Sequence, residues 1–123
     1  MLVFVATTGF AAATIDLNDF DEDAMRAIED AAKELESSIP GQDAPITIAN
    51  AEFVRDSLKW AEGYFAKKGG VEDAVKLAQQ GQVQADAIAL AAKAKNFDGA
   101  SDSFGSLKKT CKTCHDAYKP PKL

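Results

Sequence analysis

The sequence predicts an all-α protein that folds as an antiparallel, up-down-up-down four-helix bundle. Three observations favour this class. The chain has 123 residues, which is the size of one domain with a single core. Its four prolines lie at positions 40, 45, 120 and 121, so long stretches contain no residue that breaks a helix. Four of these stretches carry apolar residues at spacings of three and four, and short connections place consecutive helices antiparallel.

The first helix is expected to begin after Asn18 or Asp19, either of which can cap its N-terminus, and to end before Pro40-Gly41. Its apolar residues recur every three or four positions, which places them on one inward face. They are Met25, Ile28, Ala32, Leu35 and Ile39.

The second helix is expected over residues 48–68, after a short linker through Pro45. Gly69-Gly70 closes it, because glycine accepts the positive φ found at helix ends. The third helix is expected over residues 71–95 and carries a stripe of mostly small residues, which allows close helix contact or leaves room for a flat group. The stripe comprises Ala74, Ala78, Gly81, Ala85, Ile88 and Ala92.

The fourth helix is expected to begin near Asp98 or Ser101 and to continue to about Lys119, where Pro120-Pro121 ends it. Both cysteines of the chain fall on its inward stripe. This stripe comprises Ala100, Phe104, Leu107, Cys111, Cys114 and Tyr118.

The segment Cys111-Lys112-Thr113-Cys114-His115 has the spacing used to attach a c-type haem. Each thiol adds across a vinyl group of the porphyrin, and the histidine beside the second cysteine can then bind the iron. On a helix, positions 111, 114 and 115 share one face. The sequence therefore predicts one haem c, covalently bound through Cys111 and Cys114, with His115 as an iron ligand.

Other chemistries of a two-cysteine motif fit this chain less well. A thioredoxin-type thiol pair expects a strand followed by a helix, and no strand pattern precedes it. A structural zinc site needs four ligands, whereas the chain has two cysteines and one histidine. A disulfide between residues three apart on a helix would be strained.

The second axial position of the iron has one candidate ligand in the body of the chain. His115 is the only histidine, which excludes two histidine ligands from one chain. Met25 lies near the start of the first helix, which an antiparallel bundle places beside the end of the fourth. Methionine with histidine is a common ligand pair that raises the reduction potential. Alternatively, Met25 is ordinary core packing, the iron is five-coordinate, and the haem binds a small gas.

Residues 2–13 form an uncharged apolar stretch that ends in small residues, as in the end of a secretory signal peptide. We therefore expect residues 1–13 to be a signal-peptide remnant, and residues 14–123 to be an exported domain in the bacterial periplasm, where haem c is attached. The stretch is too short to span a bilayer, so no membrane span is expected in the mature form. A first strand or a buried apolar arm is the alternative for this segment.

The net charge of −5 argues against nucleic acid as a partner. The haem-attachment end is nevertheless locally basic. Its lysines either belong to a solvated helix face or form a docking patch for acidic redox proteins, where charge would mainly raise the encounter rate. The lysines concerned are Lys108, Lys109, Lys112 and Lys119.

Residues 110–119 resemble the Cys-Lys-x-Cys-His-Asp-x-Tyr-Lys ending of the class II cytochromes c, the cytochrome c′ family and its low-spin relatives. The resemblance covers about residues 18–120, specifically in the last helix and generically in the others. It implies that Cys111 and Cys114 carry the thioethers, that His115 is the proximal ligand, and that Met25 occupies the position that holds methionine in low-spin members. The long loop between the family's second and third helices is replaced here by Gly69-Gly70, so haem exposure and dimer contacts do not carry over.

These patterns predict a periplasmic electron-transfer protein, not an enzyme, that cycles one haem iron between its ferric and ferrous states. It is expected to be a monomer or homodimer. The alternatives are a five-coordinate protein that binds nitric oxide or carbon monoxide, and a haem subunit docked on an enzyme. The expected pocket walls are Phe65, Phe104 and Tyr118, with Leu107 and Trp60 beside them.

Overall fold

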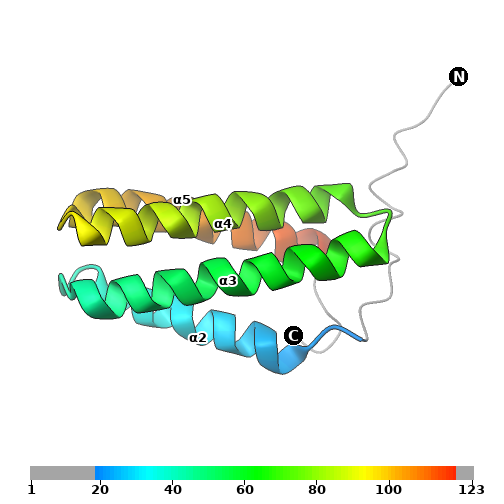
Figure 1. The fold of residues 1–123 in the computed structure, drawn as a ribbon, viewed down its shortest axis with the longest axis horizontal. Helices are drawn as coiled ribbons and strands as arrows, with labels where there is room; N and C mark the ends of the chain where they lie inside the picture. The colour runs from blue at the N-terminus through cyan, green and yellow to red at the C-terminus, as the bar shows by residue number, and fades with distance from the viewer. Residues whose placement is uncertain (1–18, 119–123) are drawn as a thin grey trace, which may run out of the picture.

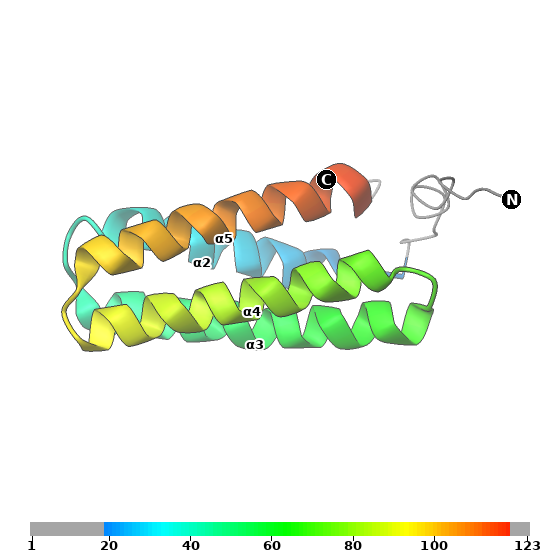
Figure 2. The same ribbon diagram turned by 90° about the horizontal axis from the view of Figure 1, so that it is seen from above.

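A computed structural model describes residues 19–118 of the chain, which form four α-helices and no strand. The predicted signal segment, residues 1–13, and Lys119 lie outside this part. The helices run alternately in opposite directions and lie side by side (Figures 1 and 2). The all-helical, four-helix prediction is therefore confirmed. The elements are α2 (Glu22–Ser38), α3 (Ala44–Lys68), α4 (Glu72–Lys93) and α5 (Phe97–Tyr118).

Helix α2 begins later than predicted, because Asp21 and not Asp19 caps it. The Asp21 carboxylate accepts hydrogen bonds from the backbone N–H groups of Asp23 (3.0 Å) and Ala24 (3.1 Å). These are two of the N–H groups that the first turn of a helix leaves without partners. Asp19 instead bonds to α3.

Helix α3 begins four residues earlier than the predicted Ile48, and Pro45 lies in its first turn instead of in a linker. Proline is tolerated there because the first-turn N–H groups have no partner within the helix. The Asp43 side chain caps this end by accepting from the backbone N–H of Ile46 (3.2 Å). At the other end, Gly69 and Gly70 have φ values of 79° and 74°, as the Gly-Gly pair predicted.

The turn between α4 and α5 also differs slightly from expectation. Helix α4 ends at Lys93, and Lys95 has a φ of 59°. Asn96 then begins the next helix, since its side-chain oxygen accepts from the backbone N–H of Gly99 (3.0 Å). Asn96 thus caps α5.

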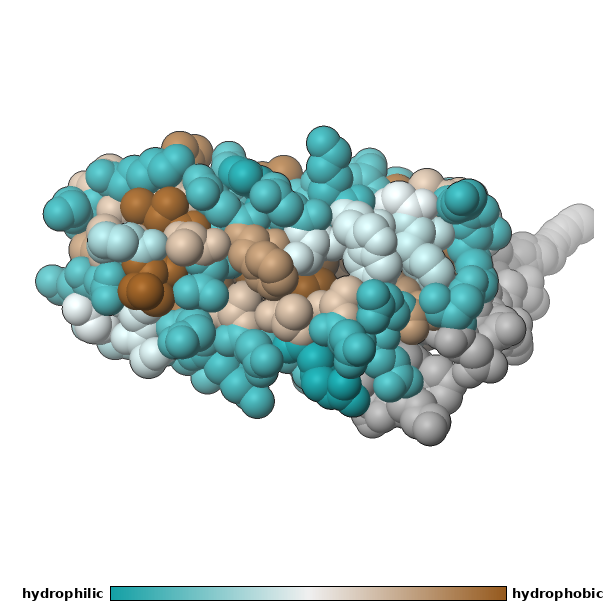
Figure 3. Space-filling view, turned by 60° about the horizontal axis from the view of Figure 1, so that its bottom comes forward, coloured by the Kyte–Doolittle hydropathy of each residue, from teal (hydrophilic) through white to brown (hydrophobic). Residues whose placement is uncertain are grey.

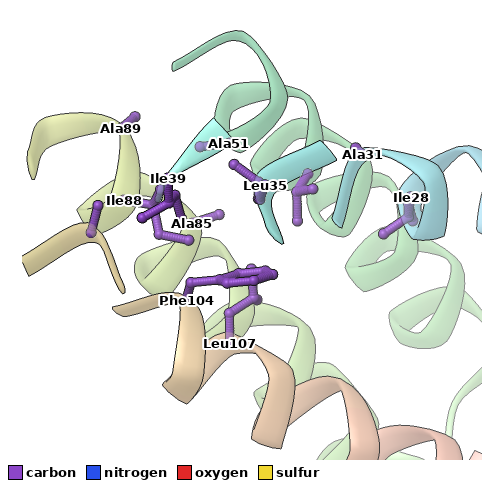
Figure 4. Packing of buried hydrophobic residues seen from close by; sticks show 12 residues of the cluster. Ile28, Ala31, Leu35, Ile39, Ala51, Ala85, Ile88, Ala89, Phe104 and Leu107 are labelled. Carbon is purple, nitrogen blue, oxygen red and sulfur yellow. The ribbon is translucent and has the colours of Figure 1, made fainter. Parts of the chain in front are cut away.

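The core follows the predicted inward faces. Ile39, Ile88 and Phe104 converge from the end of α2, from α4 and from α5 (Figure 4). The whole small-residue stripe of α4 is buried. At Gly81 the helices approach so closely that an added Cβ would lie 2.6 Å from a methyl carbon of Leu58 on α3. At Gly81, the small residue therefore allows α3 and α4 to pack closely together.

The four helices do not pack equally. Helix α3 packs closely against α4 and α2, and α4 against α5, whereas α2 and α5 approach each other far less. The bundle is consequently loosest on its α2–α5 side. Among the described residues, no helix has an apolar stretch long enough to cross a membrane.

Several large apolar side chains lie on the outside of the bundle. Ile46, Phe53 and Trp60 recur every seventh residue along α3 and are each exposed by more than two fifths. Figure 3 shows one face of the molecule, on which hydrophobic side chains form a band between hydrophilic ones. Trp60, one of the expected pocket walls, is therefore a surface residue.

Candidate functional site

An apolar cavity lies within the bundle, near the N-terminal end of α2 and the C-terminal end of α5. Its empty space, counted with that at its mouth, is about 820 Å³. The part of this space in which a water-sized sphere can move is about 120 Å³, which is smaller than the roughly 300–1,000 Å³ usual for ligand and cofactor pockets. All four helices contribute to its almost entirely apolar lining. The lining comprises Phe20, Met25, Ile28, Glu29, Ala32, Leu58, Ala61, Phe65, Leu77, Ala78, Thr110, Cys111, Cys114, His115 and Tyr118.

A second hollow adjoins this cavity on the α2–α5 side. The two share Ile28 and Ala32 of α2 and Cys111 and His115 of α5. Phe104 lies in the second hollow and does not line the main cavity. The loosely packed side of the bundle thus contains two adjoining spaces, with α2 residues on one wall and the cysteine motif on the other.

The residues that were predicted to line the haem pocket therefore do not all line the same space. Phe65 and Tyr118 line the main cavity, with ring centroids 5.8 Å apart. Phe104 and Leu107 line the neighbouring hollow. The expectation that Trp60 forms a wall is wrong, because this residue lines neither space and is 42% exposed.

The two cysteines are half-buried and occupy different parts of the interior. Cys111 packs against the core shared by α2, α3, α4 and α5, and Cys114 packs against the aromatic cluster that contains Phe65 and Tyr118. Burial raises the pKa of Cys111, and burial together with the charges of Cys111 and Asp73 raises the pKa of Cys114 to about 11. Reactive redox thiols have lowered pKa values, so this environment does not suit a thioredoxin-type pair.

Met25 and His115 line the same cavity from different helices. Met25 lies near the start of α2 and packs against both hydrophobic clusters, whereas His115 lies in the last turn of α5. Because α2 and α5 run antiparallel, residues near the start of one and the end of the other come together (Figures 1 and 2). The cavity therefore presents two thiols, an imidazole and a thioether within an apolar lining.

Phe20 and Glu29 are among the wall residues that were not anticipated from the sequence. Phe20 directly precedes the Asp21 cap and Met25 follows the cap by four residues, which is the spacing of a hydrophobic staple. That spacing would have indicated Phe20. Glu29 lies one turn after Met25 and is the one acidic residue in the lining. No sequence pattern indicated it, since an acidic residue on a helix is ordinarily taken as solvent-facing.

Tyr118 joins the end of α5 to the start of α4. Its hydroxyl donates a hydrogen bond to the Asp73 carboxylate, and its ring is buried. Burial and the neighbouring carboxylate both raise the pKa of Tyr118, which keeps the phenol protonated. This bond holds the end of α5, where His115 lies in the last turn and Cys114 directly precedes it.

The lysines near the cysteine motif are partly engaged within the chain. Lys108 lies 3.6 Å from a Glu36 carboxylate oxygen on α2, and its ammonium group is 4.8 Å from the centre of the Phe104 ring. Lys112 forms an ion pair with Asp116 at 3.1 Å. Lys109 is exposed. These pairs weaken the case for an uncommitted basic patch, although exposed ion pairs of this kind are readily broken.

The donor set matches the chemistry of a covalently attached haem better than that of a metal ion bound by the protein alone. Within residues 19–118, no three His, Cys, Asp or Glu side chains cluster as a metal site would require. Two cysteines and one histidine that line the same apolar cavity are the residues that thioether attachment and axial ligation of a haem would use. Comparison of the chain with known protein families, with curated proteins and with solved structures found no match.

Proposed function

We propose that this protein is a periplasmic mono-haem c-type cytochrome that transfers electrons and catalyses no reaction of its own. In this proposal Cys111 and Cys114 attach the haem, and His115 and Met25 bind its iron. The observation that carries the proposal is the shared cavity: one apolar space is lined by the cysteine motif and by the methionine from the opposite end of the chain. The resemblance of residues 110–119 to class II cytochromes c supports the same assignment.

The protein's own contribution would be to hold and insulate the group. The haem supplies the reversible one-electron change of its iron. The apolar lining excludes water, and Phe65 and Tyr118 pack beside the attachment residues. The Tyr118–Asp73 hydrogen bond holds the helix turn that contains His115. A rigid site with two strong ligands suits electron transfer, because little has to rearrange when the iron changes its charge.

The decisive experiment is expression of the full chain in cells that attach haem c, followed by denaturation and mass measurement. We expect the chain to retain one haem after denaturation, and a Cys111→Ala, Cys114→Ala double variant to retain none. Lys109→Ala and Lys112→Ala serve as matched surface controls and should retain the haem. A wild-type chain with two titratable thiols and no added mass would contradict the proposal.

One observation favours a second candidate function. Met25 packs against both hydrophobic clusters, as a methionine with no role beyond the core also would. If the thioether stays in the core, the iron is five-coordinate within an apolar pocket and binds nitric oxide or carbon monoxide. The spin state of the purified ferric protein separates the two functions: low-spin iron supports electron transfer, and high-spin iron supports gas binding.

The periplasmic location rests on residues 2–13 alone. Amino-terminal sequencing of the chain recovered from a periplasmic fraction tests it, with a start near Thr14 as the expected result. Recovery of the unprocessed chain from the cytoplasm would contradict export.

A further inference from the structure

The two residues that precede the α2 cap are fastened to the last turns of α3. Phe20 is only 5% exposed. The centroid of its ring lies 5.2 Å from that of Trp60, 4.8 Å from that of Tyr64 and 5.9 Å from that of Phe65. The first two contacts have the edge-to-face geometry that aromatic pairs favour.

Asp19 adds a polar attachment next to this aromatic one. Its carboxylate accepts a 2.6 Å hydrogen bond from the Tyr64 hydroxyl and a 3.0 Å bond from the Lys68 ammonium group. Lys68 also lies 5.5 Å from the centre of the Tyr64 ring. Asp19 and Phe20 therefore contact the same part of α3, Asp19 through polar bonds and Phe20 through aromatic packing.

The inner side of Phe20 belongs to the cavity wall, which it shares with Met25 and Phe65. Phe20 lies outside the regular helix, so its position depends on side-chain contacts and not on the hydrogen bonds of a helix. The side chain of Asp19 is 68% exposed. Exposed ion pairs are weak, and segments held by few contacts open without unfolding of the whole protein.

We propose that Asp19 and Phe20 form a latch that covers the part of the cavity at the start of α2 and controls how fast small apolar molecules enter there. Release of Asp19 from Tyr64 and Lys68 would allow Phe20 to swing out while the four helices stay folded. The ligands admitted would be small and uncharged, such as a diatomic gas, because the lining is almost wholly apolar. The latch requires only the cavity, so the proposal goes beyond the assignment of a haem.

The first test uses the haem-free full chain and does not depend on the proposed function. Asp19→Asn removes the negative charge that pairs with Lys68, and Tyr64→Phe removes the hydroxyl that bonds to Asp19; both leave Phe20 in place. In both variants we expect severalfold faster amide hydrogen exchange at residues 20–25 and stronger quenching of Trp60 fluorescence by acrylamide. The signal is unambiguous, since Trp60 is the only tryptophan. Asp56→Asn is the matched control, because it removes an exposed carboxylate of α3 that pairs with Arg55 and does not line the cavity.

The second test measures entry into the cavity. Xenon occupies apolar cavities, so its exchange in the haem-free chain can be followed by xenon nuclear magnetic resonance. We expect severalfold faster exchange in Asp19→Asn and Tyr64→Phe and a larger increase in Phe20→Ala. If haem is attached and its iron is five-coordinate, the rate of carbon monoxide binding to the ferrous protein should rise in the same order. If the chain attaches no haem, the proposed function is wrong, but the xenon experiment still tests the latch.

Two results would overturn the latch. Unchanged hydrogen exchange and quenching in both polar variants would show that Asp19 does not hold Phe20. Faster opening with unchanged xenon exchange would show that Phe20 does not control entry. Should Phe20→Ala fail to fold, the two polar variants still decide the question, because they leave every buried apolar side chain intact.

Discussion

The hydroxyl of Tyr118 donates a hydrogen bond to the carboxylate of Asp73, which joins the last turn of α5 to the first turn of α4. The bond matters for the site because His115 lies in that same turn of α5 and Cys114 directly precedes it. Asp73 also helps to raise the pKa of Cys114, so its charge acts at this thiol. One pair thus connects the stability of the bundle end with the geometry of the cavity.

Tyr118→Phe removes this bond and keeps the buried ring. We expect the free energy of unfolding to fall by about 1 kcal/mol, which is typical for the loss of one such hydrogen bond. Urea unfolding of the haem-free chain measures this. Asp73→Asn and the double variant complete the cycle: if the bond is the cause, the double variant should lose no more than either single one. Additive losses would show that the two residues act separately.

Met25→Leu replaces the thioether by a side chain of similar volume. Such substitutions usually cost less than about 1.5 kcal/mol, so the variant should fold. If Met25 binds the iron, the ferric protein should change from low-spin to high-spin, and its reduction potential should fall because the thioether ligand is lost. Ile28→Leu, at the neighbouring wall position of α2, is the control and should leave the spectrum unchanged. An identical spectrum in wild-type and Met25→Leu protein would remove Met25 from the metal site.

Glu29 is the one acidic residue that lines the cavity, one helical turn from Met25; because the lining is almost wholly apolar, mainly its side-chain carbon atoms face the space, with the carboxylate close by. Ferric haem iron carries one more positive charge than ferrous iron, so a nearby carboxylate favours the ferric state. In haem-loaded protein, Glu29→Gln should therefore raise the reduction potential, by roughly tens of millivolts. Asp30→Asn removes the same charge from the exposed side of α2 and should have a smaller effect. Equal shifts in the two variants would mean that net charge, and not position in the cavity, sets the potential.

Glu62 of α3 accepts 2.8 Å hydrogen bonds from the side chains of Gln82 and Gln79 of α4. These bonds favour the ionised carboxyl and lower the pKa of Glu62 below its ordinary value of 4.5. Its contribution to stability is therefore complete above that value and is lost as the pH falls through the lowered one. Glu62→Gln should be less stable than wild type at neutral pH, and the difference should shrink in acid.

Urea midpoints measured from neutral pH down to about pH 3 test this linkage. Glu34→Gln is the control, because Glu34 is an exposed carboxyl of α2 whose side chain bonds to none of the other described residues. A Glu62→Gln deficit that stays constant across the pH range would show that the bonds to Gln79 and Gln82 do not depend on ionisation.

The periodicity of the sequence was sufficient for the helices and for most of the core. Leu35, Ala85 and Leu107 were all expected on inward faces and are buried. The helix starts were less predictable. Several neighbouring acidic residues could cap a helix, and which of them does so depends on the other partners that each side chain has. Asp19 has partners on α3, which leaves the cap of α2 to Asp21.

The cavity walls were only partly predictable, for a different reason. Phe65, Phe104 and Trp60 are all aromatic residues close to an apolar face of their helices. Whether such a residue meets the main cavity, a neighbouring hollow or solvent depends on where the adjacent helices lie. Glu29 is the converse case: an acidic residue, which the sequence alone would place toward solvent, lies in the cavity wall of the loosely packed α2–α5 side.

The sequence by itself determined that this chain forms four helices, which residues of each face inward, and that its last helix carries a haem-attachment spacing. These are local properties, because helix periodicity and motif spacing depend on residues near one another in the chain. Only the tertiary structure decided that Glu29 and Phe20 share a cavity with Met25 and His115. That arrangement depends on how α3 and α4 hold α2 and α5 apart, which is a property of all four helices packed together.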